Sequence, residues 1–354
     1  MIVSTEPGLA PGPLFTYHAA MAERVRITEV GPRDGLQNEP GIILTEQKVR
    51  LVELCCATGV DEVEVTSFVS PKWVPQLGDA AEVFRALAPW LTMRWPRRDP
   101  VLSALVPNLA GLKALNAADA DLIVLVQHAI EPSKRLEYED AVMGNYFIRK
   151  FSVFTAASES FSKRNTNASI DETIERFHAV MAEGYRPSEV RGYISCAIAC
   201  PFEGPIHPRV VARVARRLAE TGVCEIDLGD TIGAADVAST VHLLEVVRDE
   251  LGAEWFSGQR VTLHLHDTHG RAAECVKAAL DLGIRSFDGS VAGLGGCPYA
   301  STPGRRAPGN ISTETLVRTV HGAGYETGVD LDRLAVAADY ARSIVAASRG
   351  GPAA

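Results

Sequence analysis

The chain has 354 residues, 46% of them hydrophobic, and its 35 Lys and Arg against 44 Asp and Glu give a net charge of −9. This length predicts either two ordinary domains or one large α/β barrel, with ample apolar material for a core. The acidic balance argues against a nucleic-acid or anionic-membrane partner, which requires a basic face, and no apolar run is long enough to span a bilayer. Seven cysteines without framework spacing favour a reducing compartment, so we expect a cytoplasmic protein.

The two ends of the chain differ in character from its middle. Residues 1–23 contain several prolines and lack the basic and apolar regions of a secretory signal, so we expect a loose leader. Residues 350–354 resemble a frayed tail. No long low-complexity linker divides the rest, and residues 24–348 are therefore predicted to form a single domain.

Short apolar stretches alternate with amphipathic ones along the chain. Strands are predicted at 25–30, 62–66, 102–106, 190–195, 225–228, 261–266 and 286–291, with a further one near 121–126 or 151–154. Helices are predicted between them, as at 45–58, 208–221, 234–251 and 271–282. In the first of these helices, Lys48 and Arg50 are expected to face outward. A last amphipathic helix at 331–348 is expected to pack outside the other elements.

Repeated strand–helix units predict a parallel sheet. Eight such units over about 250 residues match the size of a (β/α)8 TIM barrel, here with additional C-terminal helices. A doubly wound sheet is the alternative, but no G-x-G-x-x-G motif follows a strand. In a TIM barrel the active site lies at the carboxyl ends of the strands, so residues that directly follow strands are the candidates for chemistry.

The predicted strand at 261–266 ends with two histidines. Because residues i and i+2 of a strand share a face, His264 and His266 both point into the barrel. They are either core histidines with hydrogen-bond partners or ligands of a metal ion. We favour metal ligation, because the pair is followed by Asp267 and Thr268 and imidazole is a common metal ligand.

A second group follows the first predicted strand, in the run from Glu29 to Asn38. Its glycines and proline shape a tight turn that places Arg33 and Asp34 at the barrel mouth. The two side chains are either a surface ion pair or functional groups. In the functional reading Asp34 is a metal-binding carboxylate and Arg33 stabilises negative charge on a substrate.

Two further polar residues lie near this mouth. Glu64 stands in the strand at 62–66, where a carboxylate is costly unless it is paired, and Arg33 is its expected partner. Asn310 follows Pro308 and Gly309 just before a predicted helix. It is either a neighbour of the helix cap or an oxygen ligand that reaches into the mouth.

A glycine-rich loop, 293–296, follows the strand at 286–291 and leads to Cys297. Such a loop is either a plain turn or a lid whose glycines act as hinges. Cys297 is a candidate proton donor or acceptor at its tip. Cys196 and Cys200 are spaced C-x₃-C without a second pair, so we interpret them as free thiols rather than zinc ligands.

Together these motifs resemble the 3-hydroxy-3-methylglutaryl-CoA lyase family. The resemblance extends over about residues 25–345. Its matching blocks are 29–39, 66–76, 191–196, 228–233, 264–268 and 293–299.

The resemblance implies a TIM barrel with a divalent cation, Mg²⁺ or Mn²⁺, that cleaves 3-hydroxy-3-methylglutaryl-CoA to acetyl-CoA and acetoacetate in leucine degradation and ketone-body formation. It implies that the metal ligands are Asp34, His264, His266 and Asn310. Arg33 would steady the enolate, Cys297 would assist proton transfer and Glu64 would support Arg33, with Asp34 and His264 also taking part in catalysis. The expected contacts with the acyl-CoA substrate are Arg33, Gln37, Ser67 and Ser195. A homodimer is possible.

The chain departs from the family pattern at Pro40 and in longer segments near 90–100, 120–150 and 301–307, the last of which contains Arg305 and Arg306. These two arginines are either solvated or bind an anionic group of the substrate. Alternative functions are a related lyase for another 3-hydroxyacyl-CoA, such as citramalyl-CoA, a condensing acyltransferase like the isopropylmalate synthases, and a catalytically silent barrel. The sequence around Arg33 and the cysteine loop favour the lyase over the condensing enzymes.

Overall fold

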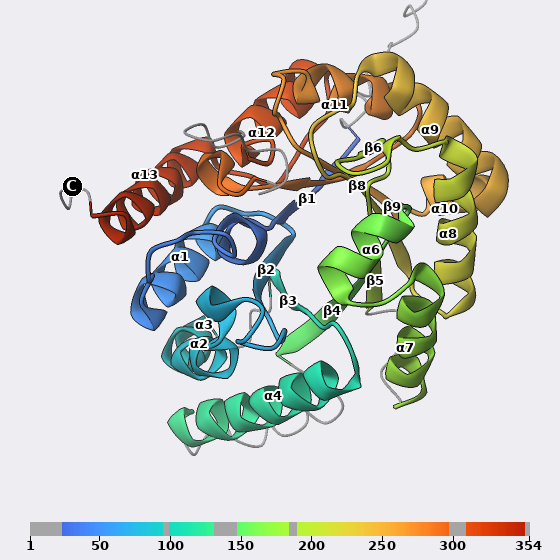
Figure 1. The fold of residues 1–354 in the computed structure, drawn as a ribbon. Helices are drawn as coiled ribbons and strands as arrows, with labels where there is room; N and C mark the ends of the chain where they lie inside the picture. Colours follow the sequence, from blue (N-terminus) through green and yellow to red (C-terminus); the bar gives the residue numbers. More distant parts are fainter. Residues whose placement is uncertain (1–22, 95–98, 131–146, 184–189, 297–308, 351–354) are drawn as a thin grey trace, which may run out of the picture.

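The computed structural model describes residues 23–94, 99–130, 147–183, 190–296 and 309–350. Parallel strands close into a barrel in the order β1-β10-β9-β8-β5-β4-β3-β2, which confirms the predicted (β/α)8 fold (Figure 1). The barrel strands are β1 (Arg26–Glu29), β2 (Glu62–Ser67), β3 (Val101–Leu105), β4 (Ile148–Ala156), β5 (Val190–Ser195), β8 (Glu225–Asp230), β9 (Val261–Leu265) and β10 (Ser286–Gly289). A small antiparallel pair, β6 (Ala199–Cys200) and β7 (Gly204–Pro205), follows β5.

Helices surround the barrel and cover the outer face of its strands (Figure 1). They are α1 (Thr45–Ala57), α2 (Ala80–Ala86), α3 (Ala88–Arg94), α4 (Leu109–Ala129), α6 (Glu159–Thr166), α7 (Ile170–Ala182), α8 (Pro208–Glu220), α9 (Val237–Leu251), α10 (Ala253–Ser257), α11 (Ala272–Asp281), α12 (Thr313–Gly322) and α13 (Leu331–Ser348). The last of these is the predicted C-terminal helix, and it packs outside the barrel against α1. None of the helices in the described parts of the chain combines the length and the apolar character that a membrane crossing requires.

Of two expectations about individual elements, the eighth strand is confirmed at one of its two alternative ranges, and the outward position of Lys48 is wrong. The stretch 121–126 belongs to the long helix α4, and the eighth strand is β4, which contains the alternative range 151–154. Lys48 of α1 does not face outward: it is buried and its ammonium group lies 2.7 Å from Asp79. The pattern misled because an internal ion pair lets a lysine occupy an inward position that otherwise requires an apolar side chain.

The register of the strands brings several polar segments to one end of the barrel. A π-helical turn, η1 (Gly31–Gly35), follows β1, a 3-10 turn, η5 (Val291–Gly293), follows β10, and His266 follows β9. All of these are carboxyl ends of parallel strands, where TIM-barrel active sites form. The predicted leader, residues 1–23, lies outside the described residues except for Glu23. The segment 297–308, with Cys297, Arg305 and Arg306, lies outside them entirely.

Candidate active site

The turn after β1 brings a cation and a carboxylate to the barrel mouth. In η1 the Asp34 amide donates to the Val30 carbonyl at 2.7 Å, which closes the turn and buries Arg33 and Asp34. The Arg33 guanidinium donates through Nε to Glu64 Oε2 at 2.6 Å and through Nη1 to Asp34 Oδ1 at 2.7 Å. Glu64 is therefore the partner of Arg33, as the sequence predicts.

His264 and His266 lie beside Asp34. Both imidazoles are buried, and their ring centroids are 5.4 Å apart. One ligand atom from each of Asp34, His264 and His266 lies within 4.8 Å of the other two. Within the described residues, His266 Nδ1 is buried without a hydrogen-bond partner. Two imidazoles and a carboxylate at this spacing form a donor set that suits a divalent metal ion.

Asn310 lies next to these three side chains. Its backbone forms an isolated antiparallel bridge with His266, and its Nδ2 donates to Asp34 Oδ2 at 2.9 Å. Its Oδ1 is buried and has no partner in the part of the chain that the structure describes. A buried amide oxygen without a partner costs free energy, and a cation is one partner that would satisfy it. Asp34, His264, His266 and Asn310 are called the mouth cluster below.

The glycine-rich loop packs directly over the mouth cluster. Gly295 has a φ of 108°, and a Cβ at this position would lie 2.7 Å from Asn310 Nδ2. On the facing segment, a Cβ at Gly309 would lie 2.5 Å from the Gly293 carbonyl oxygen. The two segments approach so closely that only glycine fits at these positions, and the loop thereby covers Asn310.

The charges at the mouth determine which groups are ionised. Burial alone would raise the pKa of Asp34, but Arg33 and the two histidines lower it to about 2. Burial, together with His264, lowers the pKa of His266 to about 4, so this imidazole is neutral at neutral pH and able to bind a metal ion. Glu64 and Asp34 raise the pKa of Arg33 against the effect of burial, which keeps this guanidinium a permanent cation.

A cavity of about 490 Å³ opens at the mouth. Its walls include Arg33, Asp34, His264 and His266 together with the three other predicted substrate contacts, Gln37, Ser67 and Ser195. Gln37 also donates to Asp34 Oδ1 at 2.7 Å, which fixes its amide beside the carboxylate. Apolar side chains, among them Leu105, Phe154 and Phe161, line another part of the wall. The cavity wall thus combines the polar mouth residues with apolar side chains and with further polar ones, among them Arg164 and Arg176.

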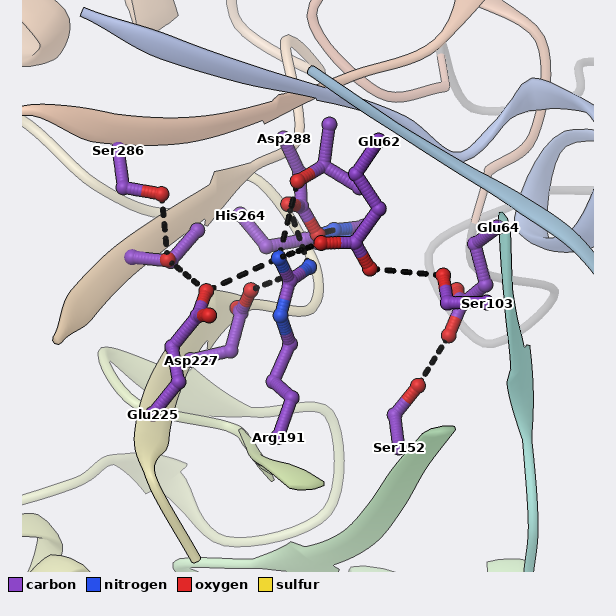
Figure 2. A network of polar contacts seen from close by, with 12 residues as sticks. Glu62, Glu64, Ser103, Ser152, Arg191, Glu225, Asp227, His264, Ser286 and Asp288 are labelled. Carbon is purple, nitrogen blue, oxygen red and sulfur yellow. Dashed lines mark hydrogen bonds and ion pairs between the residues drawn. The ribbon is translucent and has the colours of Figure 1, made fainter. Parts of the chain in front are cut away.

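Deeper in the barrel, a second group of charges surrounds Arg191 of β5, whose side chain is 1% exposed (Figure 2). The guanidinium lies 3.0 Å from Glu62 and 2.9 Å from Glu225. The ammonium group of Lys150 lies 2.7 Å and 2.6 Å from the same two carboxylates. We call Glu62, Lys150, Arg191 and Glu225 the interior charge cluster. Its two cations and two carboxylates balance one another.

Asp288 of β10 connects the interior charge cluster to the mouth. Its Oδ1 accepts from Arg191 Nη1 at 3.0 Å, and its Oδ2 lies 3.2 Å from His264 Nδ1 (Figure 2). The Tyr193 hydroxyl donates to Oδ2 at 3.1 Å, and the Tyr193 ring lies 5.4 Å from the Arg33 guanidinium carbon. Although burial opposes it, Arg191 lowers the pKa of Asp288, which keeps the carboxylate ionised. A carboxylate on the far ring nitrogen fixes the orientation of His264.

Sequence reasoning missed the interior charge cluster, Tyr193 and Asp288, although the signal was present. The rule that residues i and i+2 share a strand face was applied to the two histidines alone. The same period relates further polar pairs on the inner face: Glu62 and Glu64, Lys150 and Ser152, Arg191 and Tyr193, Glu225 and Asp227, and Ser286 and Asp288.

A closed parallel barrel with two imidazoles, a carboxylate and a fixed arginine at the carboxyl ends of its strands defines a TIM-barrel protein with a candidate metal centre at its mouth. The model of the HMGL-like family matches residues 24–340, and the chain belongs to this family.

Similar proteins cover nearly the whole chain. A hydroxymethylglutaryl-CoA lyase from Pseudomonas mevalonii is 43% identical over 88% of this chain and 90% of its own length. A 3-hydroxy-3-isohexenylglutaryl-CoA/hydroxy-methylglutaryl-CoA lyase from Pseudomonas aeruginosa is 41% identical over 94% of this chain and 97% of its own. The crystal structure of the HMG-CoA lyase from Brucella melitensis superposes with a TM-score of 0.74 at 38% identity, covering 91% of this chain and 99% of that one.

Proposed function

We propose that this chain is a carbon–carbon lyase that cleaves 3-hydroxy-3-methylglutaryl-CoA to acetyl-CoA and acetoacetate. The observation that carries the proposal is the grouping of Asp34, His264 and His266, with ligand atoms within 4.8 Å of one another, beside the fixed cation Arg33 in one cavity. The names of relatives about 40% identical over most of the chain support the same reaction.

The mouth cluster is proposed to hold a divalent cation, Mg²⁺ or Mn²⁺. Its two imidazoles, carboxylate and amide oxygen suit a hard or borderline ion. When bound, such an ion polarises the hydroxyl and carboxylate oxygens of the substrate. His264 is held for this role by Asp288, and Asp34 by Arg33, Gln37 and Asn310.

Arg33 is proposed to stabilise the charge that develops when the bond breaks. A base removes the proton of the 3-hydroxyl group, the C2–C3 bond breaks, and its electron pair becomes the enolate of the departing acetyl-CoA. A proton delivered to that carbon completes acetyl-CoA, while the former carbinol carbon becomes the ketone of acetoacetate. Arg33 lies in the cavity wall and is held by hydrogen bonds to Glu64 and Asp34, so a charged donor is fixed before substrate arrives.

The remaining roles follow the sequence expectations. Asp34 and His264 line the cavity and are proposed to take part in removal of the hydroxyl proton, and Glu64 is proposed to hold Arg33 through their hydrogen bond. Cys297, which lies outside the described residues, is proposed to assist proton transfer from the glycine-rich loop. Gln37, Ser67 and Ser195 line the cavity and are proposed to contact the acyl-CoA.

Product analysis with a small panel of thioesters tests this function. The panel contains 3-hydroxy-3-methylglutaryl-CoA, its 3-isohexenyl homologue, on which the 41% identical relative acts, and citramalyl-CoA. We expect acetyl-CoA and acetoacetate from the first compound. Cleavage of citramalyl-CoA alone would assign the chain to a different lyase, and condensation without cleavage would assign it to an acyltransferase.

We also propose that residues 24–348 form the catalytic domain, that the protein works in the cytoplasm in leucine degradation and ketone-body formation, and that it forms a homodimer. Several animal relatives are named as cytoplasmic lyases and others as mitochondrial ones. Size-exclusion chromatography with light scattering tests the dimer, and cell fractionation tests the location.

A further inference from the structure

A buried carboxylate outside the mouth cluster joins the segments that carry the site. Glu29 is the last residue of β1 and is 1% exposed. Its Oε1 accepts from the Gly31 amide at 2.7 Å and from the Val291 amide at 2.8 Å, and its Oε2 accepts from the Thr313 hydroxyl at 2.6 Å. We call Glu29, Gly31, Val291 and Thr313 the Glu29 cluster.

Each donor of the Glu29 cluster begins a different segment of the site. Gly31 opens the turn that carries Arg33 and Asp34. Val291 is the first residue of η5, which leads into the glycine-rich loop. Thr313 is the first residue of α12, three positions after Asn310. The two later segments are also tied by their backbones, because the Ser290 amide donates to the Ile311 carbonyl at 3.1 Å. A single carboxylate therefore sets the spacing of the three segments.

The packing at Glu29 leaves no room for adjustment. A Cβ at Gly31 would lie 2.7 Å from Glu29 Oε1 and 2.9 Å from Val291 Cγ1. In the described parts of the chain no cation forms an ion pair with Glu29, so its burial is not offset by an opposite charge. Burying a carboxyl group in this way is costly, which argues that the three hydrogen bonds serve a purpose beyond filling the core.

We propose that Glu29 is a positioning residue for the reaction: by bonding Gly31, Val291 and Thr313 it fixes Arg33 and Asp34 against Asn310. This inference rests on the proposed function for its catalytic meaning. The effect of Glu29 on the positions of Arg33, Asp34 and Asn310 is a property of the chain itself and is measurable as metal affinity.

The structure also provides a matched control. Asp119 of α4 is a second buried carboxyl group, 1% exposed, whose Oδ1 accepts from the Ile148 amide at 2.8 Å. Ile148 begins β4, at the opposite end of the barrel from the mouth cluster. Replacing either acid with leucine removes a buried hydrogen-bond acceptor from one end of a barrel strand, but only Glu29 borders the site.

The test compares Glu29→Leu, Glu29→Gln, Thr313→Val and Asp119→Leu in the full chain, with Mn²⁺ affinity measured by electron paramagnetic resonance and kcat measured with 3-hydroxy-3-methylglutaryl-CoA. Glu29→Leu should weaken Mn²⁺ binding and lower kcat by about 10-fold or more, the range seen when a group that orients metal ligands is lost. Glu29→Gln keeps an oxygen for both amides and an NH₂ group for the Thr313 hydroxyl, so both values should stay within about threefold of wild type.

Asp119→Leu should lower the thermal midpoint without changing Mn²⁺ affinity. Thr313→Val removes one hydrogen bond at nearly constant volume and covers the case in which Glu29→Leu does not fold. It should weaken Mn²⁺ binding severalfold.

The proposal is overturned if Glu29→Leu and Thr313→Val bind Mn²⁺ like wild type, if Asp119→Leu weakens Mn²⁺ binding equally, or if Glu29→Gln is as impaired as Glu29→Leu. A wild-type protein that does not cleave the thioester would refute the proposed function, whereas the Mn²⁺ comparison would still decide the role of Glu29.

Discussion

The interior charge cluster and the mouth cluster lie in one barrel and are both buried, but their polar atoms are satisfied in different ways. In the interior charge cluster the charges pair with one another: Arg191 and Lys150 each contact both Glu62 and Glu225, and among the described residues only Arg191 Nε of this cluster lacks a hydrogen-bond partner. In the mouth cluster, His266 Nδ1 and Asn310 Oδ1 find no partner among the described residues, and the cluster borders a cavity. Buried polar groups that bind one another support the fold, whereas buried groups with unmet capacity indicate a place for a ligand.

This difference separates stability from activity. Loss of Lys150, whose ion pairs are with Glu62 and Glu225, should affect unfolding and leave the chemistry of the folded protein intact. Changes at the mouth should affect metal binding and turnover while the barrel persists.

Metal removal should have the largest effect on activity. Chelation with EDTA should abolish cleavage, because the substrate oxygens lose the cation that polarises them, and added Mn²⁺ or Mg²⁺ should restore it. Far-ultraviolet circular dichroism should show a folded barrel throughout, since the interior charges pair without a metal. Full activity in a preparation shown to be metal-free would refute the metal site.

Lys150→Met should have the largest effect on stability. It leaves Glu62 and Glu225 with one shared cation fewer, and removing one partner of a buried ion pair costs about 3–5 kcal/mol. Denaturant unfolding should show this loss, while kcat of the folded variant stays near wild type. The double variant Lys150→Met/Glu62→Gln should recover part of it, because the excess negative charge is gone. A drop in kcat with unchanged stability would show that the two clusters are not separable.

Arg33→Gln should have the converse effect to Lys150→Met, since it should lower kcat rather than stability. Loss of a fixed donor to a developing oxyanion lowers kcat by about 10²–10³-fold. Mn²⁺ affinity should change little, because the metal ligands remain and Asp34 keeps its hydrogen bonds from Gln37 and Asn310. An increase in KM with kcat unchanged would instead indicate that Arg33 binds the substrate without stabilising the transition state.

The sequence was sufficient for the barrel and for the residues at the strand ends, because both depend on local pattern. Parallel strands alternate with helices at a readable period, and His264, Asp34 and Arg33 directly follow or end strands. The eighth strand was ambiguous because α4 contains the apolar run 121–126, which resembles a strand when read alone. Arg33 and Glu64 could be paired because they follow or lie in strands that are consecutive in the chain, whereas the Asp288–His264 contact was not predicted because it depends on the pairing of β10 with β9. Glu29 escaped notice because its three donors come together only in the closed barrel.

The smallest expected effect concerns the pH dependence of stability at Glu29. Burial is the main cause that raises its pKa from 4.5 to about 7, against the hydrogen bonds from Thr313, Val291 and Gly31. Two other titratable groups interact with Glu29. Negative charge on Glu314 of α12 raises the pKa of Glu29, and negative charge on Glu29 raises the pKa of the Cys55 thiol of α1. Between pH 4.5 and 7 the folded protein therefore binds a proton that the unfolded chain has released.

Because of this proton, the contribution of Glu29 to the free energy of unfolding is fully present below pH 4.5 and is lost as the pH rises through 7. Glutamine cannot titrate, so the stability of Glu29→Gln relative to wild type should rise over that interval, by on the order of 2 kcal/mol. Urea unfolding of both proteins at pH 5, 6, 7 and 8 gives the difference directly, and other groups that titrate in this range, such as Asp119, cancel in the comparison. A difference that stays constant across these pH values would show that Glu29 is already ionised at pH 5, and that the amide and hydroxyl donors outweigh the cost of its burial.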